Sequence, residues 1–557
     1  MPTQLQIFED TELNKALKTW EASESNKGEI FTNPEIVQFM ISTMGLQGKL
    51  LDKNTKVLEP SCGHGEFLVA MVQALCQEIK VADKKPSVNQ LRDRFRAFEL
   101  VETNIQETKR KLENILIDYY TGSEIESLLK FWLINKDFLF ANVDQEFSHI
   151  IGNPPYIRVE NIPKQILEEY RRRFSTMSDR ADIYVAFFEK SLSLLEKGGR
   201  LSFICTDRWT KNQYGRKLRA LIDNNYNLDL YVDQYEQNPF QENVLTYPAI
   251  TQISKSEKCG TVVVQNIKID NNLIDNVQTA LKDHRPCPPY ISIRNDITNG
   301  IHPWLLGCVD RLALIRKLES NFALIEKTGC RVYIGAATGN NKVFVVDEGF
   351  EIEDSRKIPL ITSADIRSGK IKPSSKCIIN TYDQSGMINL DHFPKLNHYF
   401  QQHREALSKR HIAKSSPKNW FKTIDRVYPE RAKTQKLLIP DIQDKLTVLH
   451  DAGNYHPNNS IYYICSNTWD LHALKAVLIS GIGKLFVETY TTKVASGFLR
   501  FQAQHLRRIR IPEWNGLDLE IRAQLVTAGE QENIPLAKKL TCKIYKLNEE
   551  ESELIGD

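Results

Sequence analysis

Short apolar runs alternate with amphipathic stretches from Gly28 to about residue 255, and this alternation constrains the chain more than any other feature. Such a rhythm is typical of βαβ units, which require a parallel sheet covered by helices on both faces. We therefore predict an α/β fold for this half of the chain. The predicted strands cover 56–60, 96–102, 131–138, 147–153, 199–205, 228–233 and 249–255, and the predicted helices cover 66–79, 104–118, 164–174, 182–196 and 214–224.

The chain is too long for one ordinary domain, because single hydrophobic cores rarely grow to its 557 residues. The irregular segment 259–300 contains the proline-bearing stretch "DHRPCPPY", and we interpret it as a linker. Strands and short helices are mixed after it, and the end of the chain is polar with a helical pattern. We predict three segments: 1–258, 259–515 and a helical tail over 516–557.

Composition excludes several classes of protein. No run approaches the roughly 18 apolar residues needed to span a bilayer, and "MPTQLQIFEDTELNK" is not a secretory signal. The ten cysteines are scattered and form no CxxC pair. This pattern argues against a zinc site and a disulfide framework, so we expect a reduced cytoplasmic protein without a metal.

Three predicted strands end in polar residues that suit a nucleoside-bearing cofactor. "VLEPSCGHGEFL" (57–68) places Gly63 and Gly65 in a tight turn between a strand and a helix, yet it matches neither GxGxxG nor a phosphate-binding loop. Glu99 ends the next strand, where a carboxylate can accept ribose hydroxyls, and Asp137-Phe138 follows the third. The glycines alone fit an ordinary βαβ turn, but the three strand ends in order favour a cofactor site.

The fourth strand runs into a rigid corner, Asn153-Pro154-Pro155-Tyr156, within "FSHIIGNPPYIRVE". Proline lacks the N–H that a sheet ladder needs, so two prolines in succession end the strand at this point. The corner therefore holds an amide side chain and an aromatic ring at the carboxyl edge of the sheet.

These motifs, in this order, resemble the γ class of amino-group DNA methyltransferases, in particular the TaqI-like N6-adenine enzymes. "GEIFTNPEIVQFM" (28–40) resembles the family's segment before the sheet, "LEPSCGHGEF" its cofactor loop, "FELVE" its ribose strand, "NKDFL" its adenine contact and "GNPPY" its catalytic motif. "DRWTKNQYGRKLR" (207–219) resembles the second wall of the base pocket. Weaker likenesses at 335–347, 357–366 and 483–512 resemble the family's target-recognition domain.

The resemblance implies a Rossmann-like S-adenosylmethionine-dependent methyltransferase domain over 1–258 and a mixed α+β target-recognition domain over 259–515. It implies a monomer that methylates N6 of adenine in double-stranded DNA and protects that DNA from a separately encoded restriction endonuclease. The cofactor residues that it implies are Thr32, Glu59, Ser61, Cys62, Gly63, Gly65, Glu99, Asp137, Phe138 and Asn153. Cys62 and His64, in the same loop, fit residues that fill space better than they fit catalytic residues.

The corner suits transfer to an exocyclic amino group, whose lone pair is delocalised into the ring. Acceptors on both amino hydrogens, the Asn153 side-chain oxygen and the Pro154 carbonyl, would favour a pyramidal nitrogen. Tyr156 would stack on the base, which must leave the duplex to reach the corner. In the family a second aromatic residue helps to hold the base; here we favour Tyr214 over Trp209, although Tyr214 also fits a residue packed at a helix start.

Basic residues concentrate between 401 and 436, where ten lysines or arginines meet three acids and alternate with aromatic residues. This excess predicts either a solvated face or a surface that contacts phosphates. As DNA-binding candidates we select Lys409, Arg410, Lys418 and Lys422.

Three other functions fit parts of this pattern. Transfer to N4 of cytosine uses the same amino-group chemistry, and NPPY also serves enzymes that methylate a protein glutamine or ribosomal RNA. A DNA-binding specificity subunit with an inactive catalytic lobe is the non-enzymatic alternative. The intact Glu59, Glu99, Asp137 and NPPY argue against that last reading.

Overall fold

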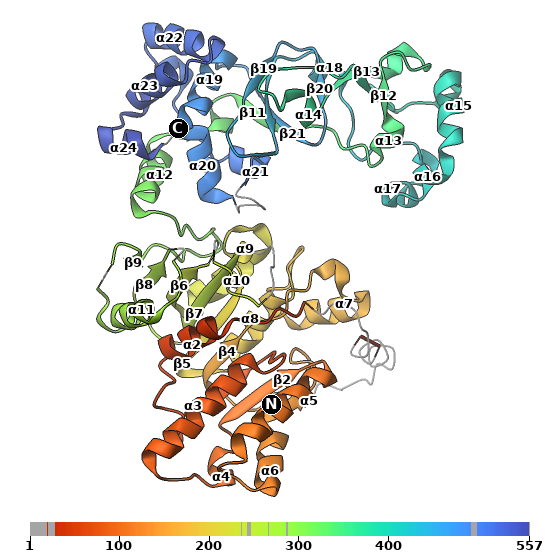
Figure 1. The fold of residues 1–557 in the computed structure, drawn as a ribbon. Helices are drawn as coiled ribbons and strands as arrows, with labels where there is room; N and C mark the ends of the chain where they lie inside the picture. Colours follow the sequence, from red (N-terminus) through yellow and green to blue (C-terminus); the bar gives the residue numbers. More distant parts are fainter. Residues whose placement is uncertain are drawn as a thin grey trace, which may run out of the picture. The chain divides into compact units, whose positions relative to one another are not determined.

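A nine-stranded sheet organises the first half of the chain in the computed structural model (Figure 1). The structure describes residues 19–20, 28–234, 237–241, 247–265, 267–285, 288–491 and 498–555. The sheet order is β3-β2-β1-β4-β5-β7-β6-β8-β9. Its strands are β1 Val57–Glu59, β2 Phe95–Glu99, β3 Leu133–Asn135, β4 Phe147–Gly152, β5 Leu195–Thr206, β6 Asn227–Asp233, β7 Pro248–Ser254, β8 Thr261–Val264 and β9 Ile291–Arg294.

The five strands from β3 to β5 run parallel, whereas β7 is antiparallel to both of its neighbours. In this parallel part the carboxyl ends of the strands meet at one edge. Since β1 lies between β2 and β4, the chain leaves β1 in one direction and later returns on its other side. That reversal creates the crevice in which open α/β sheets bind ligands.

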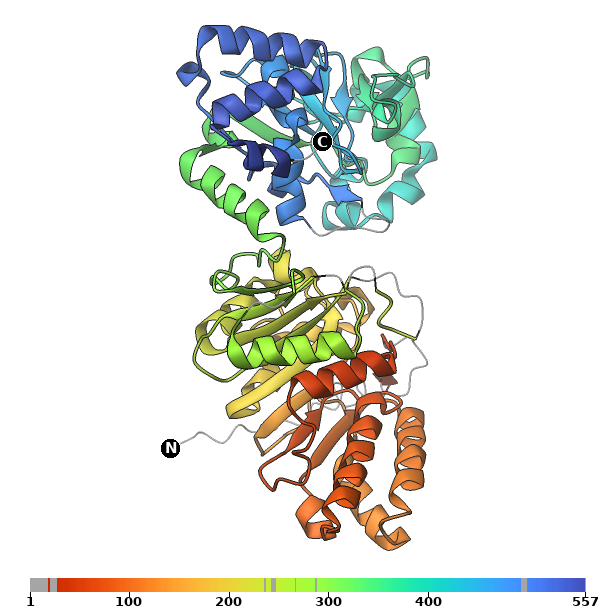
Figure 2. The same cartoon turned by 60° about the vertical axis from the view of Figure 1, so that its left-hand side comes forward.

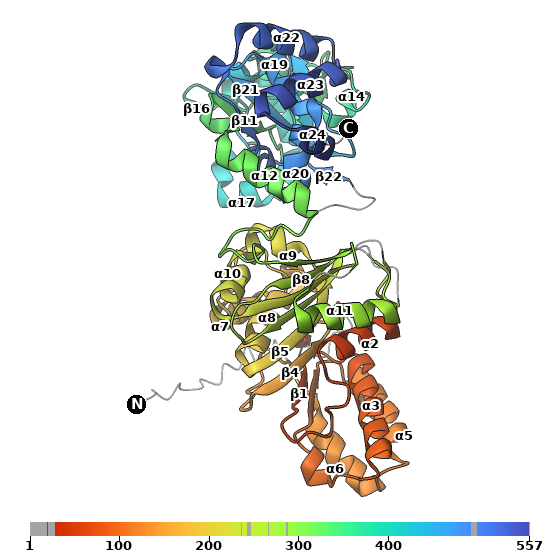
Figure 3. The same cartoon turned by 90° about the vertical axis from the view of Figure 1, so that its left-hand side faces the viewer.

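Helices cover both faces of the sheet, and Figure 3 shows the two layers. One layer packs α2, α3, α5, α6 and α11 into one hydrophobic core, and the other packs α7, α8 and α10 into a second core. These helices are α2 Pro34–Thr43, α3 Glu66–Ala82, α5 Glu102–Leu116, α6 Gly122–Trp132, α7 Lys164–Arg173, α8 Tyr184–Ser193, α10 Arg216–Asn225 and α11 Asn271–Asp283. The predicted α/β class is confirmed, and each predicted strand and helix of this half overlaps an observed one.

The segment 259–300 is not the linker that we expected. Its described residues form β8, α11 and β9, of which the two strands extend the main sheet. Both strands are only four residues long, so their sequences show too little pattern to predict a strand, whereas the nearby prolines favour an irregular segment. The chain instead divides into unit 1, Met1–Leu306, and unit 2, Gly307–Asp557.

Unit 2 contains two four-stranded sheets, of order β11-β21-β17-β19 and β12-β14-β13-β20. The first comprises β11 Cys330–Ile334, β21 Ile461–Ser466, β17 Lys436–Pro440 and β19 Leu449–Asp451. The second comprises β12 Val345–Asp347, β14 Lys376–Ile379, β13 Lys357–Ile361 and β20 His456–Pro457. Among the described residues, no helix is long and apolar enough to cross a membrane.

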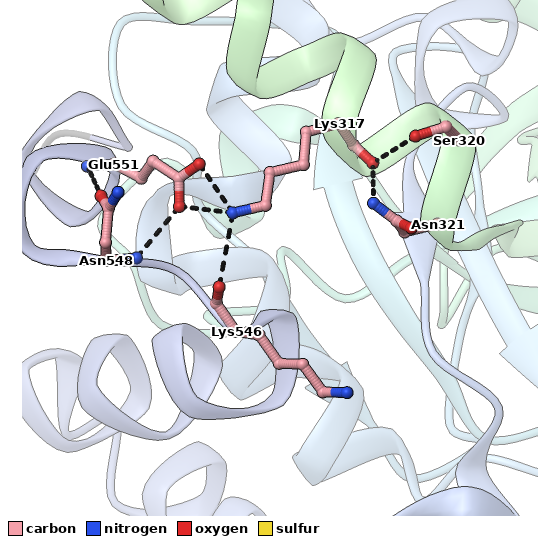
Figure 4. A network of polar contacts seen from close by, with 6 residues as sticks. All are labelled: Lys317, Ser320, Asn321, Lys546, Asn548 and Glu551. Carbon is pink, nitrogen blue, oxygen red and sulfur yellow. Dashed lines mark hydrogen bonds and ion pairs between the residues drawn. The ribbon is translucent and has the colours of Figure 1, made fainter.

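The predicted tail forms α22 Leu519–Glu530, α23 Ile534–Tyr545 and α24 Glu549–Leu554, which belong to unit 2. Figure 2 shows these helices in dark blue. Helices α22 and α23 pack against α19 Leu471–Val477, while α24 packs against α12 Val309–Asn321, the first helix of the unit. In the contact between α24 and α12, Lys317 Nζ lies 2.7 and 2.6 Å from the two carboxylate oxygens of Glu551 (Figure 4). Glu551 also accepts a hydrogen bond from the backbone N–H of Asn548 at 3.0 Å.

Helix α22 approaches α19 so closely that no side chain fits at Gly529. A Cβ at this position would lie 1.8 Å from the backbone oxygen of His472. Replacing Gly529 by Ala should therefore destabilise unit 2 by about 1–3 kcal/mol through overpacking, although alanine stabilises an unobstructed helix by about 1 kcal/mol. Urea denaturation of the two proteins measures the difference.

The matched control is Gly122→Ala in α6, where nothing lies within 4 Å of the added Cβ. That variant should be as stable as the parent protein or more stable. Equal stability of the Gly529→Ala protein and its parent would contradict the close approach of the two helices.

Candidate active site

A cavity opens at the carboxyl ends of β1, β2, β3 and β4 in unit 1. It encloses about 830 Å³ of empty space, counted out to its open mouth. Nine of the ten predicted cofactor residues line it: Thr32, Glu59, Ser61, Cys62, Gly63, Glu99, Asp137, Phe138 and Asn153. The fold thus brings together side chains that are spread over more than a hundred positions of the chain.

The tenth predicted residue, Gly65, serves the loop rather than the cavity. Its φ of +85° is left-handed, and a Cβ there would lie 2.7 Å from the Thr108 methyl group. Glycine therefore allows the loop to pack against α5. Burial raises the pKa of the Cys62 thiol well above its ordinary value, so Cys62 stays protonated and suits a packing role at the cavity wall.

Glu59 is the most unusual group of the cavity. Its side chain is 1 % exposed, and neither carboxylate oxygen has a hydrogen bond within the described residues. Burial, and secondarily the nearby carboxyl groups of Glu66 and Glu99, raise its pKa well above the ordinary value. A buried carboxylate without a partner is costly, so Glu59 is suited to a cationic ligand.

Glu99 holds the cofactor loop in place. Its Oε2 accepts a hydrogen bond from the Gly63 N–H at 2.9 Å, and its Oε1 accepts one from the Val101 N–H at 2.8 Å. Burial raises the pKa of Glu99, although these two hydrogen bonds oppose the rise. Each oxygen keeps a further lone pair, so the carboxylate can also accept bonds from a ligand.

Asp137 and Phe138 are positioned by α7 and α8. The Asp137 carboxylate accepts hydrogen bonds from the Leu139 N–H at 2.7 Å and from the Tyr170 hydroxyl. The Phe138 ring lies edge-on to Phe98, with 5.3 Å between ring centroids, and 5.5 Å from the ring of Phe187. Tyr170 and Phe187 also line the cavity, and our sequence analysis missed both because a helical apolar stripe indicates only a core.

The amide of Asn153 has a defined orientation. Its Nδ2 donates to the backbone oxygen of Ile30 at 2.8 Å and lies 3.2 Å from Thr32 Oγ1. Both partners can accept a hydrogen bond, so the nitrogen must face them and the oxygen must face away. Asn153 Oδ1 is buried and has no hydrogen-bond partner within the described residues. The wall of the cavity therefore contains a hydrogen-bond acceptor, Asn153 Oδ1, that has no donor in the described part of the chain.

The rest of the corner joins the segment before the sheet. The Tyr156 N–H donates to the Gly28 backbone oxygen at 3.1 Å, and the Ser61 hydroxyl donates to the backbone oxygen of Asn153 at 3.0 Å. Pro155 lines the cavity, whereas Pro154 is buried beside it. The Tyr156 ring is half-buried and lies edge-on to Tyr184, with 6.4 Å between ring centroids.

Of the two aromatic candidates for the base pocket, Tyr214 is half-buried, whereas Trp209 is fully buried. Its hydroxyl lies 2.7 Å from that of Tyr184, so Tyr184 links Tyr214 to Tyr156. Trp209 is 0 % exposed and packs between Phe188 and Trp304 in the core. The indole ring of Trp209 therefore cannot stack on a base.

Residues before the first strand supply another part of the wall, from which the sequence analysis selected only Thr32. Trp20, Glu29 and Phe31 line the cavity, and Phe31 stacks on His64 with 4.1 Å between ring centroids. Glu29 accepts a hydrogen bond from Asn104 at 2.8 Å. The resemblance of 28–40 to the family marked the segment of Glu29 and Phe31, but their partners lie more than 30 positions away in the sequence, so no local pattern indicated these two contacts.

The four DNA-binding candidates of unit 2 differ in their surroundings. Lys418 is exposed and Lys422 half-buried, while Lys409 forms an exposed ion pair with Glu405 at 2.6 Å. Arg410 is half-buried, and its guanidinium donates to three backbone oxygens, those of Leu407, Thr338 and Trp420, at 3.0, 3.1 and 2.8 Å. Three of its five N–H donors therefore hold segments of the unit together, so Arg410 suits a structural role better than a phosphate contact.

One lysine of the basic stretch does not reach the surface at all. Lys436 is 0 % exposed and forms an ion pair with the equally buried Asp451 at 2.6 Å. Its ammonium also donates to the backbone oxygens of Ala432 and Tyr455. The charge counted in the sequence thus overstates the basic surface of this region.

Comparison with known proteins agrees with this division of the chain. Residues 33–240 match the Eco57I restriction-modification methylase family, and residues 359–511 match the TaqI-like C-terminal specificity domain. The type II methyltransferase M.PaeR7I of Pseudomonas aeruginosa is 39% identical over 95% of this chain and 93% of its own length. M.XhoI of Xanthomonas vasicola is also 39% identical, over 95% of this chain and 99% of its own length.

Solved structures with little sequence identity share the fold. The type IIL restriction-modification enzyme MmeI, solved in complex with DNA, aligns over 98% of this chain and 72% of its own chain with a TM-score of 0.60 at 13% identity. The type ISP enzyme LlaGI aligns over 93% of this chain and 56% of its own with a TM-score of 0.52 at 12% identity. The matches along the sequence go further than the fold, and they show that the chain belongs to the type II methyltransferases of restriction-modification systems.

Proposed function

We propose that this methyltransferase transfers a methyl group from S-adenosylmethionine to the N6 amino group of an adenine at a specific site in double-stranded DNA. The observation that carries the proposal is the unused, buried oxygen of Asn153, held at the cavity wall by hydrogen bonds on the other side of its amide. An amino group is the donor that this acceptor lacks.

The cavity suits the cofactor in charge and shape. S-adenosylmethionine, when bound, supplies a methyl group activated by its sulfonium. Five carboxyl groups line the wall, those of Glu29, Glu59, Glu66, Glu99 and Asp137, against one lysine, Lys136. This excess of acids favours a cation, with the unpartnered Glu59 as the strongest contributor.

The other wall residues divide the recognition of the cofactor among them. Glu99 is placed to accept the ribose hydroxyls, Asp137 to accept an exocyclic amino group, and Phe138 to contact the adenine ring. Thr32, Ser61 and Gly63 complete the wall near Asn153.

The corner then activates the target nitrogen. The Asn153 oxygen and the Pro154 carbonyl accept hydrogen bonds from the two amino hydrogens, which favours a pyramidal nitrogen with its lone pair available for attack. Both acceptors are held in place before the reaction, so they stabilise the transition state without reorganisation. In-line alignment supplies the remaining acceleration.

The target base must leave the duplex to reach this corner. Tyr156 is placed to stack on the flipped base, and Tyr214, joined to it through Tyr184, is the second aromatic candidate. Transfer to N4 of cytosine needs the same acceptors, so the identity of the methylated nucleoside decides between the two bases. The match to a specificity domain favours DNA over a protein glutamine or ribosomal RNA.

Unit 2 supplies the contacts that select the site. Lys409, Lys418 and Lys422 are the candidates for phosphate contacts, whereas Arg410 acts within the domain. We propose that the protein acts as a cytoplasmic monomer on DNA. Its product would protect that DNA from a restriction endonuclease encoded by another chain.

Replacing Asn153 by Ala should lower the rate of methyl transfer by about 100-fold or more, because the acceptor acts mainly in the transition state. Cofactor affinity should change much less. Mass spectrometry of nucleosides from methylated DNA gives the rate and the product, and calorimetry gives the affinity. N6-methyladenine is the product expected from the parent protein.

Asn142→Ala is the matched control for this substitution. The Asn142 amide is exposed, and its hydrogen bond goes to Asp144, so its loss should leave the rate unchanged. If the Asn153→Ala protein transferred methyl groups as fast as the Asn142→Ala protein, the proposed mechanism would be wrong.

Replacing Glu59 by Gln should stabilise the ligand-free protein and weaken cofactor binding at the same time. The pKa of Glu59 is higher in the folded protein than in the unfolded chain, so the folded protein binds more protons. The free energy of unfolding therefore falls as the pH rises from the unfolded-state pKa of Glu59 through its folded-state pKa. The neutral amide avoids that loss, so the melting temperature above neutral pH should rise. Without the charge, cofactor affinity should fall by about tenfold or more.

Thermal unfolding with and without S-adenosylmethionine measures both effects. Glu102→Gln is the control, because this carboxylate is exposed at the start of α5. A lower melting temperature for ligand-free Glu59→Gln than for Glu102→Gln would refute the assigned electrostatic cost of Glu59.

A further inference from the structure

Unit 2 contains an open groove that is separate from the methyltransferase cavity. It encloses about 1980 Å³ of empty space, counted out to its open mouth. Three parts of the chain form most of its wall, 354–359, 380–384 and 426–433. The last of these belongs to the basic stretch 401–436, and all of them except 354–358 lie within the matched specificity domain.

One arginine of this groove is held in place by aromatic rings while it stays exposed. Arg426 Cζ lies 5.3 Å from the ring centroid of Tyr428 and 5.7 Å from that of Tyr382. Its Nη2 donates to the backbone oxygen of Asp383 at 2.6 Å. In the described part of the chain this is its one hydrogen bond, so Nε and Nη1 remain available to a ligand.

The ring of Tyr428 is itself fixed from another side. Arg431 Cζ lies 4.2 Å from the centroid of Tyr428 and 4.7 Å from that of Tyr333. Tyr382 is anchored through its backbone, since its N–H donates to Asn380 Oδ1 at 3.0 Å and its oxygen accepts from Arg356. Both rings beside Arg426 therefore belong to a connected framework, which limits the conformational entropy that Arg426 loses on binding.

Three acids line the groove, Asp354, Asp383 and Glu430, and none of them forms an ion pair with Arg426 among the described residues. The Asp354 carboxylate pairs with Lys357 at 2.7 Å, and that of Asp383 accepts the N–H groups of Ser385 and Gly386 at 2.8 and 3.1 Å. The Lys357 side chain lowers the pKa of the Asp354 carboxyl, and the Ser385 hydroxyl, followed by the two N–H groups, lowers the pKa of the Asp383 carboxyl. Arg426 thus offers an uncompensated, oriented guanidinium at the wall of an open groove.

We propose that Arg426 reads a guanine of the recognition site through the major groove of DNA, with Tyr382 and Tyr428 fixing the plane of its guanidinium. This inference rests on the proposed DNA substrate. Guanine presents two acceptors, O6 and N7, at its major-groove edge, and a guanidinium in a fixed plane can donate to both. A lysine ammonium is a point charge without a plane, so it cannot reproduce that geometry.

The test measures methylation rates on the parent site and on duplexes that carry each single base-pair substitution of that site. The site itself is first found by sequencing DNA methylated by the parent protein. For Arg426→Ala we expect the discrimination at one G·C pair to fall by roughly 10- to 100-fold, with the preferences at the other positions unchanged. Arg426→Lys should restore DNA affinity but little of the discrimination.

Lys418→Ala is the control, because Lys418 is exposed and lies outside the groove wall. As a phosphate contact it should weaken methylation of all duplexes alike and reduce the salt dependence of binding. If Arg426→Ala behaved in the same uniform way, Arg426 would be a phosphate contact and base reading would be excluded.

Two further outcomes separate this inference from the proposed function. A parent protein that methylates one DNA site, together with an Arg426→Ala protein of unchanged sequence preference, would overturn the inference alone. A parent protein that binds S-adenosylmethionine but leaves DNA unmodified would overturn both. Circular dichroism of the variants establishes that they are folded.

Discussion

The hydrogen bonds between Asn153 and residues 30–32 hold the methyltransferase site together. They join the end of β4 to a segment that precedes the whole sheet. The hydrogen bond from the Tyr156 N–H to the Gly28 oxygen, three residues further along the chain from Asn153, joins the same two segments. Position 28 tolerates only glycine, because a Cβ would lie 2.7 Å from the Tyr156 backbone. The same contacts that close the cavity wall thus orient the amide of Asn153, for which we propose the catalytic role.

Electrostatics in this site favour ligand binding over the stability of the empty protein. Glu59 has no hydrogen bond within the described residues, although Glu99 and Asp137 nearby are well satisfied. In unit 2 the buried charge is paired, and the charge without an ion-pair partner is at the surface. There the buried Lys436 is fully paired, and the exposed Arg426 is oriented but not neutralised. In each unit the uncompensated charge has the sign opposite to that of the proposed ligand.

The sequence predicted the parallel sheet and most of the cavity wall, because residues at the ends of parallel strands must converge. It could not predict the wall residues that come from helices, because the apolar stripes that contain Tyr170 and Phe187 resemble those of any core helix. Strands β8 and β9 also escaped prediction, since four residues are too few to show a clear period. Charge counting failed for a related reason. Lys436 and Arg410 are indistinguishable in sequence from surface residues, and only the folded chain shows that they are engaged inside it.

The contact between Lys317 and Glu551 also has a consequence for how such proteins diversify. It places α12, the first helix of unit 2, beside α24, its last helix, so the two ends of the unit lie close together. Domains whose ends meet tolerate insertion and exchange, since a substitute need only supply the same pair of ends. A recognition module closed in this way can be replaced as a cassette, which would give an unchanged catalytic half a new target.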